Sequence, residues 1–371
     1  MTTPSSPGNV VLPNPKPTPL LSTAEETAAS QVCEVTIKIP FGPPANTGEV
    51  GTLGPYRIVK QLGEGGMGAV YAAIDTRLER RLAVKVMHPK FATHATSKAR
   101  FLREARAVAR INHDNVVIVY EADEREGVSY IAMEYLEGYP LDEYLKKKGN
   151  PALSQILRIG AEAAAGLSAA HKLGIVHRDI KPANLWLSAP RGRVKVLDFG
   201  LAKPTDDNVE VTTDGTVVGT PSYMSPEQAN GESVDHRTDL YSLGVVLYRL
   251  CTGRLPFEGP TTMAVLLALS NRDPQPIQEQ NPEVPNMLAK LIHQLLAKKA
   301  DHRPATADEV VKRLRAIAQD MAIPLTQAIK QTQLLPDVTD KSRFSAKLSS
   351  KLPWFWGFVT PETDFCRSRP T

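Results

Sequence analysis

Between residues 56 and 136, short apolar runs rich in strand-forming residues alternate with polar turns. Such runs predict a β-sheet built from short strands. The expected strands span residues 56–62, 69–75, 81–87, 116–121 and 128–134. One stretch between them has a different period, because its apolar residues recur at spacings of three and four, which predicts a helix with one buried face. These residues are Phe101, Leu102, Ala105, Val108 and Ala109.

Beyond Leu136 the pattern becomes mostly helical. Residues 153–173 and 238–252 are long and apolar, and both are rich in Ala, Leu and Val. Residues 305–319 have the alternating charge of an amphipathic helix. The second part of the chain is therefore expected to be a bundle of helices.

Gly138 and Pro140 mark the boundary between these two parts and are typical of a connecting strap. The chain is therefore expected to have an α+β fold with two lobes. The first is a small antiparallel β-sheet lobe with one main helix (residues 53–136). The second is a larger and mostly helical lobe (residues 137–318).

Composition narrows the class of protein. A chain of 371 residues, of which 42% are hydrophobic, can form one large two-lobed domain or two ordinary domains with flanking segments. The formal charge of +4 is mild and the basic residues are spread along the chain, so nucleic acid is not expected as a partner. Cys33, Cys251 and Cys366 are too few and too scattered for a disulfide framework or a zinc site.

These cysteines favour a reducing compartment, and we expect a cytoplasmic location. The N-terminus does not have the pattern of a signal peptide. No run in the sequence reaches the roughly 18 to 20 apolar residues needed to span a bilayer. The chain as given is expected to be soluble.

The two ends of the chain differ from the rest. Residues 1–52 are rich in Pro, Thr, Ser and Gly and are expected to be disordered, because they bury too little apolar surface to offset the entropy of ordering. Residues 319–371 are expected to be a poorly ordered tail. Within it, Lys341, Arg343, Lys347 and Lys351 precede an aromatic run at residues 352–358. This stretch could bind an anionic membrane interface, which is the less favoured interpretation. The alternatives are that it docks on the folded domain or on a partner, or that it makes no fixed contact.

A glycine-rich segment lies at the start of the first lobe, with Gly63, Gly65 and Gly68 in a G-x-G-x-x-G-x-V pattern that ends at Val70. Glycine lets backbone N–H groups approach phosphate oxygens without a Cβ in the way. A dinucleotide-binding site has a similar pattern but continues into a helix. Here residues 70–74 continue as a strand, which favours a lid over a nucleotide phosphate chain.

Residues 177–200 are the most informative stretch. The sequence His177-Arg178-Asp179-Ile180-Lys181-Pro182-Ala183-Asn184 is followed, after two short expected strands at 185–188 and 193–197, by Asp198-Phe199-Gly200. It supplies a carboxylate that can take a proton, a lysine two residues later, and an Asn and an Asp suited to Mg²⁺. These groups can move a phosphoryl group onto a hydroxyl.

Together these motifs resemble a bacterial eukaryotic-like (Hanks-type) serine/threonine protein kinase over residues 54 to about 318. Lys181-Pro182 is the serine/threonine form of the loop. The resemblance implies the bilobal protein kinase fold and transfer of the ATP γ-phosphoryl group to Ser and Thr hydroxyls of proteins, the kinase itself included. It also implies ATP and Mg²⁺ (or Mn²⁺) as cofactors.

The resemblance assigns the catalytic roles. Asp179 would orient the substrate hydroxyl and accept its proton, and Lys181 would neutralise charge on the moving phosphoryl group. Lys85 would reach the α- and β-phosphates, held by Glu104 from the neighbouring helix; the simpler alternative is a solvated edge lysine. The metal ligands would be Asn184 and Asp198.

The resemblance also assigns an ATP pocket, with Met133 as gatekeeper, the backbone of Glu134 and Leu136 at the adenine edge, and Trp186 as the floor. Kinases more often have an aliphatic residue or Met at the floor. In the simpler interpretation, the Trp186 indole packs below adenine or turns into the lobe. In the alternative, it narrows the pocket and alters the nucleotide preference. The expected pocket residues are Leu62, Gly63, Gly65, Gly68, Val70, Ala83, Lys85, Met133, Glu134, Leu136 and Trp186.

Regulatory and structural positions follow from the same resemblance. Arg178 would bind a phosphorylated activation loop, and the candidate sites of autophosphorylation are Thr212, Thr213 and Thr216, the first two preferred. Residues 219–227 resemble the end of an activation segment, with Ser-Pro-Glu at 225–227. Thr220 would contact the catalytic loop, and Asp239 would support that loop from below. Glu227 and Arg303 would form a structural ion pair.

Two other classes were weighed against an active protein kinase. A pseudokinase that acts as a nucleotide-binding scaffold would typically lack one or more of the catalytic residues, which are all present here. A small-molecule kinase would lack the activation segment that ends at Ser225-Pro226-Glu227. The expected partners are protein substrates, and a homodimer for autophosphorylation in trans is left open.

Overall fold

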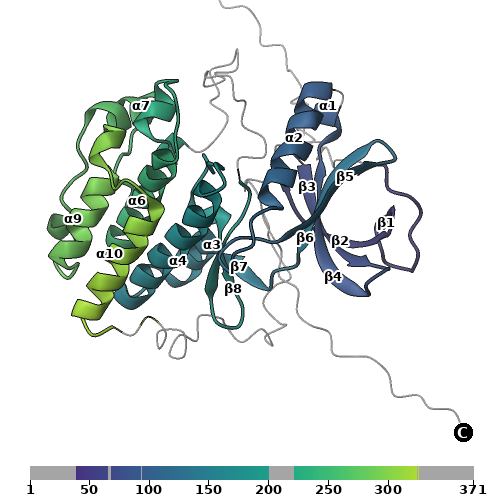
Figure 1. Cartoon of the computed structure of the whole chain (residues 1–371), viewed down its shortest axis with the longest axis horizontal. Coiled ribbons are helices and arrows are strands. Elements are labelled where there is room, and N and C mark those ends of the chain that lie inside the picture. Colours follow the sequence, from purple (N-terminus) through teal and green to yellow (C-terminus); the bar gives the residue numbers. More distant parts are fainter. Residues whose placement is uncertain (1–38, 66–67, 93, 200–220, 324, 326–371) are drawn as a thin grey trace, which may run out of the picture. The chain divides into compact units, whose positions relative to one another are not determined.

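The computed structural model describes residues 39–65, 68–92, 94–199, 221–323 and residue 325 (Figure 1). The expected phosphorylation sites Thr212, Thr213 and Thr216, together with Thr220, lie outside the described residues. So do residues 1–38 and 326–371, which hold most of the two segments expected to be disordered.

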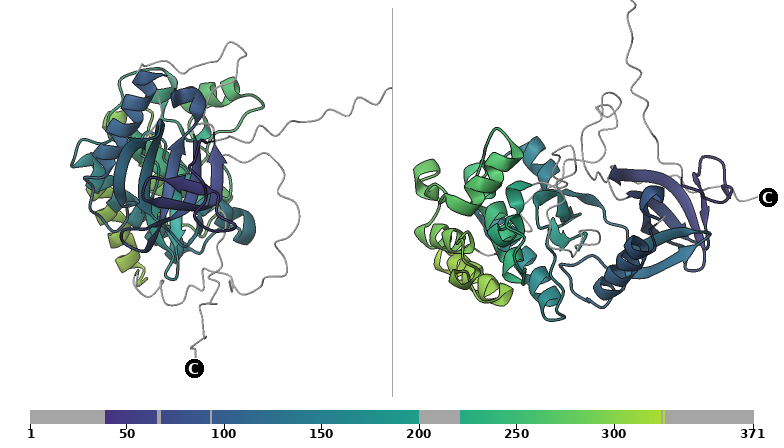
Figure 2. Two further views of the ribbon diagram at one scale, coloured as in Figure 1. Left: turned by 90° about the vertical axis from the view of Figure 1, so that its right-hand side faces the viewer. Right: turned by 90° about the horizontal axis from the view of Figure 1, so that it is seen from above.

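The small lobe contains a six-stranded antiparallel sheet in the order β1-β2-β3-β4-β6-β5. The strands twist relative to one another (Figure 2). They are β1 (Gly51–Leu53), β2 (Tyr56–Gly65), β3 (Gly68–Asp75), β4 (Arg80–Met87), β5 (Val119–Arg125) and β6 (Val128–Glu134). The expected strands at 56–62, 69–75, 81–87 and 128–134 are therefore confirmed.

The strand expected at 116–121 begins three residues later, as β5 at Val119. The apolar residues before it are used elsewhere: Val116 forms a parallel bridge with Val196, and the Val117 N–H donates to the Val196 carbonyl oxygen at 3.1 Å. An apolar run with strand character thus contacts the large lobe instead of extending the sheet.

Ordered structure begins earlier than the expected residue 53. The Gly42 N–H donates to the Thr52 carbonyl oxygen at 2.9 Å, and the Phe41 ring packs edge-on against Tyr71, with centroids 5.0 Å apart. The Gly- and Pro-rich composition of this segment predicts disorder. In the structure, two apolar side chains, Ile39 and Phe41, are enough to pack the segment against the sheet.

The small lobe also holds α1 (Pro89–Ala92) and α2 (Ala95–Val108). Helix α2 contacts β5 and β6, and Figure 1 shows it beside the sheet. Its buried residues are Phe101, Ala105 and Val108, as their helical spacing predicts. Its position matters for the site because it carries Glu104.

The large lobe is mainly helical. Helices α4 (Leu153–His171), α6 (Arg237–Thr252) and α10 (Ala307–Asp320) match the three expected helices within two residues at each end, and α10 lies along α4 (Figure 1). The others are α3 (Leu141–Lys148), α5 (Pro226–Ala229), α7 (Thr262–Asn271), α8 (Ile277–Gln280) and α9 (Asn286–Leu295), with 3₁₀ turns η1 (Pro182–Asn184), η2 (Pro221–Tyr223) and η3 (Ala300–His302). Among the described residues, no helix is both long and apolar enough to cross a lipid bilayer.

A second, three-stranded sheet lies between the helices of the large lobe and the expected ATP pocket. Its order is β7-β8-β9, from β7 (Gly138–Pro140), β8 (Leu185–Ser188) and β9 (Arg193–Val196). One face of β8 and β9 presents Leu185, Leu187, Val194 and Val196 to the core of the large lobe. Trp186 belongs instead to a separate apolar cluster with small-lobe residues, which include Leu62, Val70 and Ala83. This second cluster is where the expected ATP pocket lies.

Candidate active site

Buried Asp239 holds the backbone of the loop that contains His177 and Arg178. Its carboxylate accepts hydrogen bonds from both backbone N–H groups at 2.8 Å and contacts His171 Nε2 at 2.8 Å. Asp239 lies in the first turn of α6, where the helix dipole favours a negative charge. Arg178 has φ of 64°, a left-handed conformation that these hydrogen bonds help to hold.

The buried ring of His177 links the two halves of the site. Its Nδ1 accepts a hydrogen bond from the Asp179 N–H at 3.2 Å, and its Nε2 is 2.7 Å from the Leu197 carbonyl oxygen. Because a carbonyl oxygen can only accept, Nε2 carries the proton and Nδ1 does not. Burial lowers the pKa of His177, which favours this neutral form.

Two predicted catalytic side chains, Asp179 and Lys181, lie together in the loop with the predicted metal ligand Asn184. Lys181 Nζ is 2.8 Å from Asp179 Oδ2, and Asn184 Nδ2 donates to the backbone oxygen of Asp179 at 2.8 Å and to its Oδ2 at 3.1 Å. The turn η1 brings Asn184 back toward Asp179. The carboxylate is thus fixed by an ammonium and an amide while remaining partly exposed.

Asn184 and Asp198 supply oxygen ligands suited to Mg²⁺. Because Nδ2 of Asn184 donates to Asp179, its Oδ1 is left as the atom available to a cation. Among the described residues, no group of three or more His, Cys, Asp or Glu side chains is arranged to hold a metal ion. A pair of oxygen ligands completed by phosphates and water is the usual form of a Mg²⁺ site, so the residues present fit this ion.

Lys85, from β4, contacts Asp198 rather than the expected Glu104. Its Nζ is 2.7 Å from Asp198 Oδ1, and the lysine side chain is only 6% exposed. Within the described part of the chain, Lys85 and Glu104 form no ion pair, and Oε2 of Glu104 is buried without a hydrogen-bond partner. The expected lysine–glutamate pair is therefore not formed in this structure.

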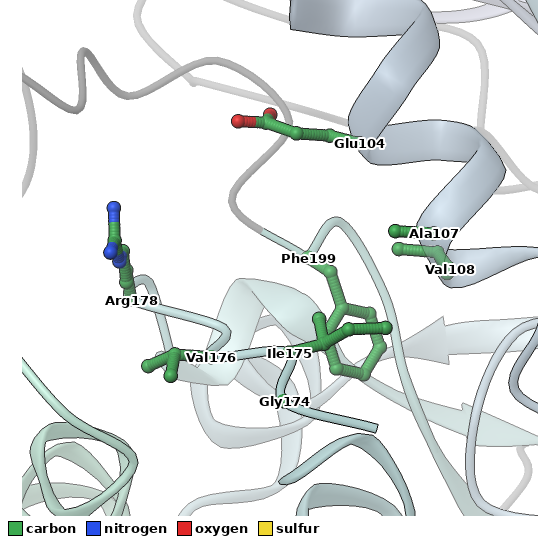
Figure 3. Close-up of a pocket in the computed structure, with 8 residues that line it drawn as sticks. All are labelled: Glu104, Ala107, Val108, Gly174, Ile175, Val176, Arg178 and Phe199. Carbon is green, nitrogen blue, oxygen red and sulfur yellow. The ribbon is translucent and has the colours of Figure 1, made fainter.

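Glu104 lines a pocket of about 200 Å³ between α2 and the loop. Figure 3 shows its side chain extending from the helix toward the side on which Arg178 lies, with Phe199 and Val108 on the apolar side of the pocket. Burial raises the pKa of Glu104 to about 7, although Arg100, Arg103 and Arg178 act to lower it. Because α2 directs the carboxylate into this pocket, Asp198 is the acid that meets Lys85.

The glycine segment connects β2 and β3. Gly63 pairs with Val70 and Gly65 with Gly68, while residues 66 and 67 lie outside the described residues. At Gly68 a Cβ would lie 1.9 Å from the Val86 carbonyl oxygen. Close packing on β4 therefore requires glycine at this position, in addition to any approach of a phosphate.

Six of the expected ATP pocket residues, from both lobes, lie in one apolar cluster. It contains Leu62, Val70 and Ala83 from the sheet, Met133 and Leu136 from around the strap, and Trp186 from β8. The Trp186 ring is buried, and its Nε1–H donates to the Glu137 carbonyl oxygen at 3.2 Å. The indole therefore packs within the cluster and is anchored to the strap; its effect on nucleotide preference stays a prediction.

Comparison with known proteins agrees with this geometry. The family of the protein kinase domain matches residues 56–314. The chain is 43% identical over 257 residues to the serine/threonine-protein kinase Pkn1 of Myxococcus xanthus, covering 68% of this chain and 37% of that protein. It is 40% identical over 259 residues to the serine/threonine-protein kinase PknB of Mycobacterium leprae, covering 69% of this chain and 42% of that protein.

The chain belongs to the protein kinase family, and these two relatives are bacterial serine/threonine-protein kinases. It spans less than half the length of Pkn1 and PknB. The fold is also similar to the crystal structure of the Mycobacterium tuberculosis PknI kinase domain, with a TM-score of 0.57 and 26% identity, covering 71% of this chain and 96% of that one. The bilobal protein kinase fold expected from the sequence is thereby confirmed.

The kinase contains the ion pair expected to stabilise its large lobe. Arg303 binds both carboxylate oxygens of Glu227, at 2.6 and 2.8 Å, and the Thr238 hydroxyl donates to Glu227 Oε1 at 2.7 Å. Burial acts to raise the pKa of Glu227, but the hydrogen bonds and the charge of Arg303, together with the hydrogen bond from Thr238, outweigh it and hold the pKa below its ordinary value. Residues 225–229, which include the expected end of the activation segment, are thus fixed to the large-lobe core.

Two residues of the kinase that contact the site were not found from the sequence. Lys195 in β9 reaches the carboxylate of Glu134, with Nζ 2.5 Å from Oε1, and His171 at the end of α4 contacts Asp239. A signal for Lys195 is its place between Val194 and Val196, which alternation puts on the face opposite the core. His171 lies on a long apolar helix and gives no comparable signal.

Proposed function

We propose that this kinase transfers the γ-phosphoryl group of ATP to Ser and Thr hydroxyls of protein substrates, and that it phosphorylates itself. One observation carries the proposal: Asp179 is held by Lys181 and Asn184 in a loop whose backbone is fixed by the buried Asp239. A positioned carboxylate, an adjacent cation and an amide ligand are what phosphoryl transfer requires.

In the proposed reaction, Asp179 orients the substrate hydroxyl and accepts its proton. The hydroxyl oxygen forms the new bond to the γ-phosphorus as the bond to the β,γ-bridging oxygen breaks, and ADP leaves. Lys181 lies beside Asp179 and would neutralise charge on the moving phosphoryl group. Mg²⁺ or Mn²⁺, held by Asn184 and Asp198, would neutralise phosphate charge.

Lys85 would contact the α- and β-phosphates of bound ATP, and Glu104 would hold it there after the two side chains meet. In the present arrangement Lys85 is close to Asp198, 2.7 Å away, and so already lies next to one proposed metal ligand. The buried and unpartnered oxygen of Glu104 supports such a meeting, because a cation would satisfy it.

Regulation is proposed to act through phosphorylation of Thr212 or Thr213, with Arg178 as a ligand of the phosphate and Thr216 as a further candidate. Thr220 would contact Asp179 and Lys181.

The scattered cysteines support a cytoplasmic location, and autophosphorylation in trans would require two copies to meet. The rival proposal, a pseudokinase scaffold, is less favoured because the catalytic residues are all present.

The test is autophosphorylation of the purified chain with labelled ATP and Mg²⁺, compared with Asp179→Asn and followed by mass spectrometry of the modified residues. Label on threonines between 205 and 216 in the parent, absent in the variant, would support an active kinase and name its regulatory site. The double change Thr212→Ala/Thr213→Ala should then lower activity. No label in the parent, with nucleotide binding intact and a generic protein substrate also untouched, would favour the pseudokinase.

A further inference from the structure

In the structure Gly138 and Pro140 belong to β7, and the lobes are joined by the residues before it, from Glu134 at the end of β6 to Glu137. We call residues 134–137 the strap, and side chains from the large lobe hold it at both ends. At its first residue, the Glu134 carboxylate accepts from Lys195 Nζ at 2.5 Å. At its last residue, the Glu137 carbonyl oxygen accepts from Trp186 Nε1 at 3.2 Å. We call Trp186 and Lys195 the strap clamp.

The two clamp residues act from one face of the small sheet. Trp186 and Lys195 are directly paired in the β8–β9 ladder, so their side chains leave the sheet on the same side. The neighbouring pairs, Leu185 with Val196 and Leu187 with Val194, put their side chains into the large-lobe core on the other side. The core thus fixes the two strands from one face while the clamp holds the strap from the other.

The Glu134 carboxylate is the junction of this arrangement. Besides Lys195, it accepts a hydrogen bond from the Ile118 N–H at 2.7 Å, and Lys195 Nζ also lies 3.4 Å from the Val116 carbonyl oxygen. The side chains of Lys195 and Glu134 are only 12% and 15% exposed. A charge-assisted contact so shielded from water is stronger than a surface ion pair.

We propose that the strap clamp positions the adenine-binding backbone, and thereby raises the affinity of the kinase for adenine nucleotides. The inference rests on the proposed function, in which the backbone of Glu134 and Leu136 meets the adenine edge. A strap fixed before nucleotide binds loses less conformational freedom on binding, and this preorganisation appears as affinity. Lys195 is a positioning residue, because its Nζ contacts Glu134 and the Val116 carbonyl oxygen and it is not one of the expected adenine-pocket residues. The Trp186 Nε1–H acts on the strap through the Glu137 carbonyl, while the Trp186 ring also forms the expected floor of the pocket.

The first experiment compares Lys195→Met with a matched control, Arg193→Met. Both residues lie on β9 and both form an ion pair, but Arg193 contacts Asp114, which is 77% exposed, and does not contact the strap. We expect Lys195→Met to raise the Kd for ADP, measured by titration calorimetry, by about 5- to 10-fold, which is about 1 to 1.4 kcal/mol. Arg193→Met should leave this Kd unchanged.

A second set of variants tests whether the effect passes through the strap. In a Glu134→Gln background, Lys195→Met should change the Kd much less than it does alone, because its partner charge is already gone. Trp186→Phe keeps an aromatic ring in the cluster but removes the Nε1–H donor, and we expect it to raise the Kd about 3-fold. Lys195→Arg, which restores the charge, should recover part of the affinity.

The kinetic readout separates positioning from stability. The clamp predicts that Lys195→Met raises KM for ATP while kcat changes by less than about twofold, because the chemical groups are untouched. An unchanged Kd in both Lys195→Met and Trp186→Phe would overturn the inference. So would parallel losses of kcat and melting temperature without a change in Kd, which would assign the contacts to stability alone.

The outcome is distinguishable from failure of the proposed function. ADP binding is measured without turnover, so a parent protein that binds ADP but transfers no phosphate would contradict the kinase proposal and still report on the clamp. If Lys195→Met does not fold, Glu134→Gln removes the charge from the other side of the same contact and provides the comparison, with Arg193→Met as the control.

Discussion

The two sides of the active site differ in how completely their contacts are formed. On the large-lobe side, Asp179 is held by Lys181 and Asn184, and the loop backbone is held by Asp239. On the small-lobe side, Lys85 and Glu104 are separate, and Glu104 has a buried oxygen without a partner. The first set of contacts lies within one lobe, whereas the second depends on the position of α2.

This difference shows which part of the site is preorganised. The large-lobe contacts are buried or partly buried hydrogen bonds, two of them made by Asp239 of α6, so they persist as long as that lobe is folded. The pairing of Lys85 with Glu104 requires that the Glu104 carboxylate turn out of its pocket toward β4. The expected lysine–glutamate pair thus depends on a change at α2, whereas the contacts of Asp179 are already formed.

The largest effect should come from the preformed side. Asp179→Asn keeps a side-chain oxygen for Lys181 and Asn184 but removes the proton acceptor, and we expect kcat to fall by about 10²- to 10⁴-fold. Single-turnover assays with saturating ATP measure the loss. The affinity for ADP and the melting temperature should stay near those of the parent, and a kcat within about threefold of the parent would contradict the role of Asp179.

A second large effect is expected on stability. Arg303→Met leaves Glu227 buried without its cation, and breaking such a pair typically costs about 3–5 kcal/mol of unfolding free energy. The matched control is Asp301→Asn, which breaks the ion pair of Arg237 with an aspartate that is 85% exposed and should cost no more than a few tenths of a kcal/mol. Urea unfolding measures both; equal losses would show that burial of the pair is unimportant.

Asp239→Asn should affect stability and catalysis together. One amide oxygen cannot replace two carboxylate oxygens that accept from His177, Arg178 and His171, so at least one buried donor loses its partner. We expect a loss of about 2–3 kcal/mol and a fall in kcat as the loop backbone loosens. A variant with parental kcat despite that loss would show that Asp239 does not position the loop.

The smallest effect tests the unformed side through its pH dependence. The pKa of Glu104 rises from its ordinary 4.5 to about 7 in the folded chain. The folded state therefore keeps the proton between these values while the unfolded state releases it, so stability falls as pH rises through this window. Below about pH 4.5 both states are neutral, and above about pH 7 the full penalty remains.

Glu104→Gln removes this penalty. Relative to the parent, the variant should be nearly as stable at about pH 5 and about 1–2 kcal/mol more stable at about pH 8, after allowance for partial solvent access to the side chain. Chemical unfolding at both pH values measures the difference. A difference that does not change with pH would mean that Glu104 already ionises at its ordinary value, as it would beside Lys85.

The sequence predicted most of this site because its signals are local. Strands β2, β3, β4 and β6 and the helices α4, α6 and α10 follow apolar patterns that neighbouring residues determine. The start of β5 was misplaced because Val116 and Val117 contact β9. The early strand β1 was missed because it has only three residues and is fixed by its pairing with β2 and the burial of Leu53. Both errors arise from tertiary contacts that no short pattern records.

Within the site, too, features set by neighbouring residues were predicted and features set by tertiary contacts were not. The catalytic loop is contiguous in sequence, so its residues could be assigned together from one motif. The orientation of Glu104 depends on how α2 packs, and the contact of Lys195 with Glu134 joins residues far apart in the chain. No spacing rule predicts such contacts, so the strap clamp can be seen only in the folded structure.

The ring of His177 has a consequence for distances within the site. One nitrogen binds the backbone of the proposed base, Asp179, and the other binds the residue just before Asp198, a proposed metal ligand. The imidazole is rigid and neutral, so it acts as a spacer of fixed length between the proposed base and the segment that carries the proposed metal ligand. A movement of the small lobe would therefore leave the separation between these two proposed groups unchanged.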